Sequence, residues 1–262
     1  MNTDTPASID LQTQNGIALL TINQPSARNA MTPKMLDSLA ELTKQCSEDD
    51  SIGCVLVTGA GEQAFCAGGD ISGVVDNGDD AASPGQSELV AMLERWSQSV
   101  VHLHTMPKPS IAVLNGVAAG AGMGLALSCD LRIASPTASF VTAFARLAMS
   151  GDFGGSYFLT QLVGPAKARE LYFLSERVNA EDALTLGMIN RIVAAEQLQS
   201  EAMALANRLV QAPAPMYKAM KANLNASLNA DVHSVVKQEA KTMIECALSE
   251  ATQKATAAFF NR

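Results

Sequence analysis

The sequence predicts an α/β fold, and three features support this prediction. Residues 53–59 and 110–114 are apolar runs of strand length, typical of strands that are covered on both faces. Segments with helical periodicity, at residues 32–49 and 88–104, alternate with these runs. Because a helix between two buried strands is the usual crossover of a parallel sheet, we expect such a sheet with helices packed on it.

The composition is that of a globular protein with an apolar bias. Among 262 residues, 48% are hydrophobic and 17% are charged, and the mean hydropathy is +0.11. An apolar excess of this kind is often accommodated in subunit contacts. The net charge is −8 and the chain has no block of Lys or Arg, so neither a nucleic acid nor a membrane is expected as a partner.

Cysteine usage and the first residues predict a cytoplasmic protein. The five cysteines are odd in number and show no C-x-x-C pairing, so we expect free thiols in a reducing compartment. Residues 1–6 lack the basic-then-apolar pattern of a secretion signal. Residues 111–127 are nearly long enough to span a membrane, but Asn115 and the glycines indicate a buried strand and helix instead.

The N-terminal part begins the alternation of strand and helix. Residues 16–22 are a β-rich run, and residues 24–31 follow as a loop. Thr32 and Pro33 then supply an N-cap and a first-turn proline for a helix with one apolar face.

A junction of small residues follows the strand at residues 110–114. Glycines and alanines crowd between residues 116 and 126, and a helix is expected to begin near Gly122. Its first N–H groups would be unpaired, and small side chains would let an anion or a developing oxyanion approach them. The alternative is a tightly packed junction without a ligand. The turn at residues 68–70 has the same two interpretations, because glycines there can turn backbone N–H groups toward a ligand.

These two segments together carry a resemblance to a known family. Residues 64–71 (AFCAGGDI), 115–122 (NGVAAGAG) and 129–134 (CDLRIA) resemble motifs of the enoyl-CoA hydratase/isomerase superfamily, also called the crotonase superfamily. The similarity continues through residues 138–140, 154–156, 162–164 and 179–190. It implies a superhelical spiral core of β-β-α units over residues 1–195, followed by a C-terminal helical trimerisation region over residues 196–262.

The resemblance implies an acyl-CoA thioester as substrate, with coenzyme A as part of that substrate and no separate cofactor. The backbone N–H groups of Gly69 and Ala121 are then the oxyanion hole that holds the thioester oxygen. Preorganised donors of this kind stabilise an enolate strongly, and one of them lies at a helix N-terminus. The residues that the resemblance assigns to coenzyme A or substrate binding are Ala27, Arg28, Ala67, Asp70 and Ile71.

The sequence departs from the family pattern at the acid and base. Members that hydrate a 2-enoyl-CoA carry two glutamates, and this chain has Gly124 and Phe144 at those positions, where we expect them to line the pocket. A carboxylate lies eight residues after Phe144, at Asp152. Its position is similar to that of the aspartate in isomerases of the phenylacetate-degradation branch.

Asp152 suits double-bond isomerisation. Moving a double bond from the 3,4 to the 2,3 position requires one group to take a proton from the α-carbon and return it at the γ-carbon. An apolar pocket with Phe144 and Phe153 nearby would raise the pKa of Asp152 toward a useful range. The alternative is that Asp152 only caps a helix that begins near Phe153. A related dehalogenase uses an aspartate here as nucleophile, but its histidine base has no counterpart at His102 or His104.

Beyond residue 157 the sequence predicts helices almost throughout. The periodic segments are residues 159–163, 166–174, 180–186, 196–210, 215–228 and 232–248. A proline-rich break at residues 211–215 separates the last two from the others. In the family such a tail builds a trimer, often paired into a hexamer, so we expect a homotrimer or a dimer of trimers.

The sequence therefore predicts an enzyme that isomerises an unsaturated acyl-CoA, with Asp152 as the proton carrier. No metal site is expected, because His102 and His104 point about 200° apart on a helix. One alternative is hydration of a 2-enoyl-CoA by carboxylates that the sequence does not identify, or by a single one. Glu88, Glu94 and Asp70 are weaker candidates that could approach the pocket. An alternative of another class is a non-catalytic acyl-CoA-binding subunit, since both family glutamates are missing.

Overall fold

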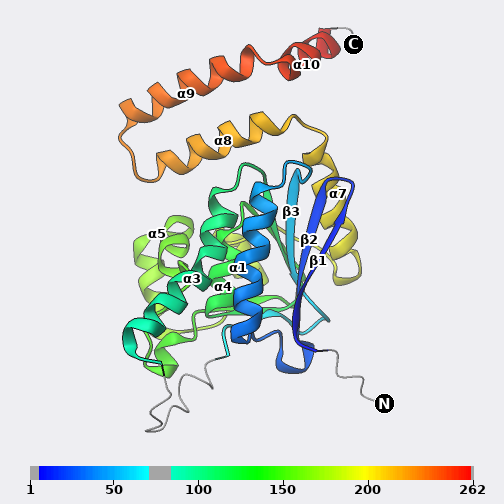
Figure 1. Cartoon of the computed structure of the whole chain (residues 1–262). Coiled ribbons are helices and arrows are strands. Elements are labelled where there is room, and N and C mark those ends of the chain that lie inside the picture. Colours follow the sequence, from blue (N-terminus) through cyan, green and yellow to red (C-terminus); the bar gives the residue numbers. More distant parts are fainter. Residues whose placement is uncertain (1–5, 71–83, 261–262) are drawn as a thin grey trace.

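The computed structural model describes residues 6–70 and 84–260 and is built around two sheets (Figure 1). The large sheet has the order β1-β2-β3-β5-β7-β10, with bounds Ser8–Gln14, Ile17–Asn23, Cys54–Gly59, Ser110–Leu114, Leu131–Ala134 and Arg191–Ile192. The small sheet has the order β4-β6-β8-β9, with bounds Ala64–Cys66, Val117–Ala119, Ser139–Val141 and Val178–Asn179. The pairs β1–β2 and β8–β9 are antiparallel, and the other pairs are parallel.

The core is a spiral of β-β-α units, as the sequence predicted. β3 is followed by β4 and then α3 (Gln86–Thr105), β5 by β6 and α4 (Ala121–Ser128), and β7 by β8 and α5 (Gly155–Leu174). In each unit the first strand lies in the large sheet and the second in the small sheet. The turn between the two strands therefore repeats at the carboxyl edge of the large sheet.

The large sheet is covered on both faces, which explains its apolar strands. Val55 and Val57 of β3 pack in the cluster that includes α1 (Pro33–Glu48) and α3, whereas Cys54 and Leu56 pack with α7 (Leu198–Val210). Because successive side chains of a strand point to opposite faces, both sets must be apolar to be buried. The predicted two-sided burial of residues 53–59 is confirmed.

Several local predictions are also confirmed. α1 begins after Thr32, whose side chain accepts a hydrogen bond from the Met35 N–H (3.4 Å), and Pro33 is its first residue. α5 contains the break expected between its two periodic segments, because Gly164 has φ +76° and interrupts the helical dihedrals. The remaining elements are η1 (Pro25–Ala27), η2 (Phe144–Leu147), α6 (Ala180–Thr185), η3 (Ala195–Gln197), α8 (Ala214–Ser227), α9 (Val232–Ala247) and α10 (Glu250–Phe260).

The sequence did not predict β1, α10 or the strands of the small sheet. The small-sheet strands have two or three residues each, which is too short for a periodic pattern. β1 is mostly polar, and its last three residues are exposed, because it pairs only with β2 at the edge of the large sheet. These strands are therefore defined by their pairing with neighbours and not by their own composition.

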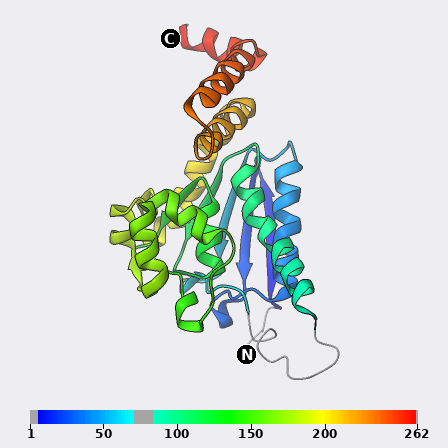
Figure 2. The ribbon, with the colours of Figure 1, turned by 90° about the vertical axis from the view of Figure 1, so that its left-hand side faces the viewer.

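The helices α8, α9 and α10 stand off the core (Figures 1 and 2). Lys221 anchors α8, because its Nζ lies 2.7 Å from Asp130 Oδ2 and also donates to the Leu103 carbonyl (2.7 Å). By contrast α9 buries no residue. Large apolar side chains are exposed on or beside these two helices: Met220, Leu224, Leu228, Val232, Val236, Met243, Ile244 and Leu248. The predicted division after residue 195 stays a prediction.

The five cysteines are free thiols, as expected. Cys46, Cys54, Cys66 and Cys129 are buried, and burial raises the pKa of the Cys66 and Cys129 thiols to about 12. Cys246 on α9 is half-buried. Across residues 6–70 and 84–260, no helix has both the length and the apolar character needed to cross a membrane.

Candidate active site

The loop after β4 and the start of α4 lie against each other. A Cβ atom added to Gly68 would be 3.3 Å from the Ala119 carbonyl oxygen and 3.8 Å from the Ala121 nitrogen. Gly122 is closer still to β4, because a Cβ there would lie 2.3 Å from the Cys66 carbonyl oxygen. The small residues therefore allow the two predicted oxyanion-hole segments to meet, with Gly68 at φ +112° making the turn.

The backbone around Gly69 and Ala121 leaves the N–H groups of both residues without an acceptor in the neighbouring bridge or helix. Met31 and Gly69 form a parallel β-bridge, in which Met31 bonds the two residues that flank Gly69. The Met31 N–H donates to the Gly68 carbonyl, and the Asp70 N–H donates to the Met31 carbonyl, both at 2.8 Å. In such a bridge the N–H of the central residue points to the opposite side. Ala121 is the first residue of α4, so its N–H has no acceptor within the helix.

Asp152 lies on the loop between η2 and α5, which packs on the second turn of α4. A Cβ atom on Gly124 would lie only 2.5 Å from the Phe153 carbonyl oxygen, so glycine is needed for this contact. Gly124 follows Ala121 by three residues, a rise of about 4.5 Å along the helix. The carboxylate is thus carried by a loop that is seated one turn from the predicted oxyanion hole.

Asp152 is a half-buried carboxylate with a raised pKa. Burial raises its pKa from 3.8 to about 6, and its Oδ1 is buried without a hydrogen-bond partner among the described residues. The side chain does not cap α5: the N-cap is Gly154, which makes no side-chain cap hydrogen bond. The expectation that Asp152 caps a helix near Phe153 is therefore wrong, and α5 begins at Gly155.

Phe144 lies between the start of α4 and the loop that carries Asp152. Its ring would lie 3.6 Å from a Cβ on Gly120, the N-cap of α4, and 3.4 Å from a Cβ on Gly151. The ring also stacks on Tyr172, with centroids 6.3 Å apart and planes at 13°. Phe144 and the buried Phe153 thus supply the apolar surroundings expected beside Asp152. No pattern in the sequence pointed to Tyr172, whose place depends on the fold of α5 against η2.

The predicted coenzyme A contacts lie on neighbouring loops. The Ala67 N–H donates to the Arg28 carbonyl (3.1 Å), which ties the loop with Ala27 and Arg28 to the segment before Gly69. Asn29 fixes this loop further, since its Nδ2 donates to the carbonyls of Ala60 (2.9 Å) and Ala64 (2.7 Å). Ile71 lies outside the described residues.

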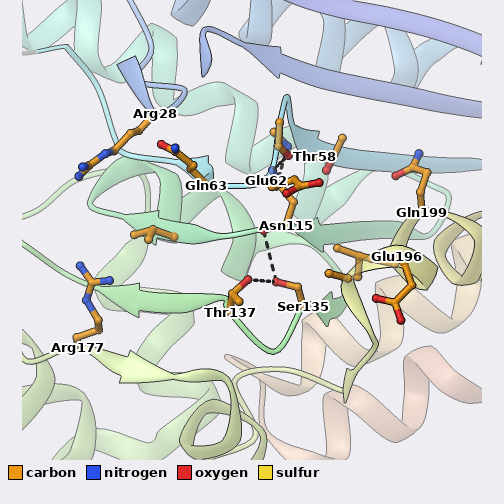
Figure 3. A pocket seen from close by; sticks show the side chains of 15 residues that line it. Arg28, Thr58, Glu62, Gln63, Asn115, Ser135, Thr137, Arg177, Glu196 and Gln199 are labelled. Atoms are coloured by element: carbon orange, nitrogen blue, oxygen red, sulfur yellow. Dashed lines mark hydrogen bonds between the residues drawn. The ribbon is translucent and has the colours of Figure 1, made fainter. Parts of the chain in front are cut away.

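A cavity of about 960 Å³ lies at the carboxyl edge of the large sheet (Figure 3). Arg28 and Arg177 stand at one end, and Glu196 and Gln199 at the other. Its middle is lined by side chains from the turns after β3, β5 and β7, including Thr58, Asn115, Ser135 and Thr137. Of the residues predicted for the site, Arg28 alone lines this cavity, so it is separate from the surroundings of Asp152.

The other candidate residues lie outside this arrangement. His102 Nδ1 is 3.2 Å from Thr43 Oγ1 on α1, and the ring of His104 packs edge-on against Phe158. Both rings therefore belong to contacts between helices. Glu88 and Glu94 are exposed on α3.

The fold and these loops define a spiral α/β protein in which the glycine-bordered start of α4 lies one turn from the loop of a half-buried carboxylate. Residues 12–262 match the family described as Enoyl-CoA hydratase/isomerase. The chain belongs to this family, the crotonase superfamily, and is an enzyme of that superfamily.

Relatives within the family have different named reactions. The chain is 30% identical to a short-chain-enoyl-CoA hydratase of Clostridium acetobutylicum, over 97% of this chain and 95% of the relative. It is 40% identical to 1,2-epoxyphenylacetyl-CoA isomerase of Escherichia coli, over 76% and 75% of the two chains. The solved structure of an enoyl-CoA hydratase from Polaromonas sp. JS666 has a TM-score of 0.89 at 28% identity, covering 97% of both chains.

Proposed function

We propose that this enzyme shifts a double bond in an unsaturated acyl-CoA, with Asp152 as the sole proton carrier. The observation that supports this most is the half-buried Asp152 carboxylate, which lies on a loop packed one turn from the predicted oxyanion hole and has its pKa raised to about 6. A base with a pKa near the working pH is most effective in both taking up and returning a proton. The relative that is 40% identical is named an isomerase, of 1,2-epoxyphenylacetyl-CoA, which supports isomerisation of an acyl-CoA over addition of water.

The proposed cycle uses two backbone donors and one carboxylate. The N–H groups of Gly69 and Ala121 hold the thioester oxygen as the Asp152 carboxylate removes a proton from the α-carbon of a 3-enoyl-CoA. The electron pair delocalises into a dienolate, whose oxygen charge the two donors stabilise. Asp152 then returns the proton to the γ-carbon, which leaves the double bond at the 2,3 position and Asp152 again charged.

Hydration of a 2-enoyl-CoA is the second candidate, favoured by the hydratase relatives that match along almost the full chain. Geometry opposes the usual pair of glutamates. A glutamate at position 124 would place its Cβ 2.5 Å from the Phe153 carbonyl oxygen and push away the Asp152 loop. A hydratase built on this chain would therefore have to work with Asp152 as its acid and base.

We propose that coenzyme A enters only as part of the substrate, with its nucleotide end along Ala27 and Arg28, and with Ala67, Asp70 and Ile71 as further substrate or coenzyme A contacts. The hydrogen bond from the Ala67 N–H to the Arg28 carbonyl supports this, because it joins the loop that carries Ala27 and Arg28 to the segment before Gly69. Proton transfer by Asp152 needs no metal, so overnight dialysis against EDTA is expected to leave the turnover rate unchanged. The free thiols support a reducing, cytoplasmic location.

Mass spectrometry in deuterated water tests the reaction. Incubation with a 3-enoyl-CoA is expected to yield a 2-enoyl-CoA without added water, and exchange of the proton on Asp152 with the solvent before its return adds deuterium to the product. Asp152→Asn is expected to lower this rate by about 10²–10⁴-fold, the usual contribution of a general base. Glu176→Gln, the same carboxylate-to-amide change at an exposed position, is the matched control. Addition of one water to a 2-enoyl-CoA, without isomerisation, would show a hydratase instead.

A further inference from the structure

Two buried polar atoms without hydrogen-bond partners lie on adjoining parts of the site. They are Oδ1 of Asp152 and the hydroxyl oxygen of Tyr172, each unpartnered among the described residues. A buried polar atom without a partner costs free energy, so two of them in one cluster call for an explanation. One is a pure acceptor when Asp152 is charged, and the other carries a proton to donate.

Tyr172 lies directly under the loop that carries Asp152. Its ring carbon Cε1 lies 3.0 Å from the position of a Cβ on Gly151, and its hydroxyl oxygen lies 2.6 Å from that of a Cβ on Gly155. These glycines stand on either side of Asp152 in the sequence and leave room for the phenol. Stacking on Phe144 holds the ring in this place.

Electrostatics couples the two side chains. Burial, followed by the negative charge of Asp152, raises the pKa of Tyr172 to about 12. The phenol therefore stays protonated, and able to donate, over the whole range in which Asp152 titrates.

The other charged groups around Asp152 and Tyr172 either bond to other residues or are exposed to solvent. On η2, Arg146 Nη2 donates to the Ser175 carbonyl (2.9 Å). On α5, Lys167 and Glu170 form an exposed ion pair (2.7 Å) and Arg169 is exposed. α4 carries no titratable side chain apart from its flanking Cys129. Tyr172 is thus the hydroxyl donor that the described residues place beside Asp152.

We propose that Tyr172 is the positioning residue of Asp152: its phenol O–H and Asp152 Oδ1, which form no hydrogen bond in the structure, pair when the carboxylate is charged. The inference rests on the proposed function, in which Asp152 is charged before it takes the proton and after it returns it. The hydrogen bond favours the anion over the acid, so it offsets part of the rise in pKa that burial causes. It also fixes the rotamer from which the carboxylate reaches the substrate.

The pH profile of Tyr172→Phe tests this role. Loss of the donor raises the pKa of Asp152, so the acidic limb of kcat/KM is expected to move up by about one pH unit. The rate with a 3-enoyl-CoA should then fall about threefold at pH 5.5 and stay nearly unchanged at pH 8.5. Tyr157→Phe makes the same change on the same helix, at a hydroxyl that accepts a hydrogen bond from Asn229, and should leave the midpoint unchanged. A rate lowered equally at every pH, or not at all, would overturn the proposal.

A titration without substrate separates this inference from the proposed function. In protein labelled with ¹³C at the aspartate carboxyl carbons, the Asp152 signal is identified by its loss in Asp152→Asn. Tyr172→Phe is expected to raise the midpoint of this signal, and Tyr157→Phe is not. A raised midpoint without isomerase turnover would refute the isomerase and keep the Tyr172–Asp152 coupling. An unchanged midpoint would refute the coupling whatever the reaction.

Discussion

At the scale of the residue, Asp152 combines a carboxylate with surroundings that disfavour its charge. The loop that carries it places Phe153 in the core and leaves Oδ1 without a partner, and burial alone sets the direction of its pKa shift. Such a residue lowers the free energy of unfolding when it is charged, and it is useful for proton transfer. The two properties can be measured separately, because only one of them depends on substrate.

The cost to stability has a defined pH range. The pKa of Asp152 rises from 3.8 in the unfolded chain to about 6 in the folded one, so folding is penalised as pH rises from about 4 to 6 and above. The full penalty is about 3 kcal/mol. Asp152→Asn is therefore expected to be more stable than the wild type at pH 8 by about 1–3 kcal/mol, and equally stable at pH 4. Urea unfolding at both pH values measures this, with Glu176→Gln as control. Equal stabilities at pH 8 would contradict the burial of a charged Asp152.

Gly124 is the second residue on which the site depends. Gly124→Ala puts a methyl group within 2.5 Å of the Phe153 carbonyl oxygen, so the Asp152 loop must move. We expect a loss of about 1–3 kcal/mol of unfolding free energy and at least a tenfold loss of kcat/KM, measured by urea unfolding and by the deuterium assay. Gly85→Ala is the matched control, since no atom lies within 4 Å of a Cβ there. Full activity of Gly124→Ala would show that the Asp152 loop is not held by α4.

At the scale of the element, Lys221 fastens α8 to the core. Its ammonium group is 8% exposed and meets Asp130 Oδ2 and the Leu103 carbonyl. Lys221→Met leaves Asp130 half-buried without its cation, and we expect a loss of about 2–3 kcal/mol of unfolding free energy. Lys218→Met, an exposed position on the same helix, is expected to change it by less than about 0.5 kcal/mol. Urea unfolding of both variants checks this, and equal effects would mean that the pair does not anchor α8.

The elements differ in how far the sequence could predict them. β3 and β5 were predictable because two-sided burial requires an unbroken apolar run, and α1 because its cap and proline mark its start. β4, β6 and β8 were not, because three residues contain no period and their order depends on pairing across the small sheet. The glycine loops and Asp152 were found through spaced motifs. Tyr172 was not found, since its contact with residues 151 and 155 exists only after α5 folds back on η2.

At the scale of the whole molecule, the C-terminal helices expose more apolar surface than a monomer needs. Leu224 on α8 is 67% exposed, and Val236 and Ile244 on α9 are 55% and 60% exposed. Contiguous exposed apolar groups of this kind mark interaction surfaces. We propose that a second and third copy of the chain cover them, in a homotrimer or a dimer of trimers.

Charge substitutions on these helices test the assembly. Leu224→Lys combined with Ile244→Lys is expected to shift the full chain from trimer or hexamer to monomer in light scattering, because burying two ammonium groups opposes association. Glu239→Lys combined with Glu245→Lys adds charge at exposed polar positions of α9 and is expected to leave the mass unchanged. A wild-type chain that is monomeric at micromolar concentration would refute the proposal.

The unequal burial of the cysteines makes the folded chain selective toward thiol reagents. Cys46, Cys54, Cys66 and Cys129 are buried with raised pKa values, so almost no thiolate is present to react, whereas Cys246 on α9 is partly open to solvent. A maleimide dye should therefore attach at one place, on the surface proposed to meet neighbouring subunits. A dye on Cys246 would thus report on assembly. Labelling beyond one dye per chain would measure the fraction of molecules whose core has opened.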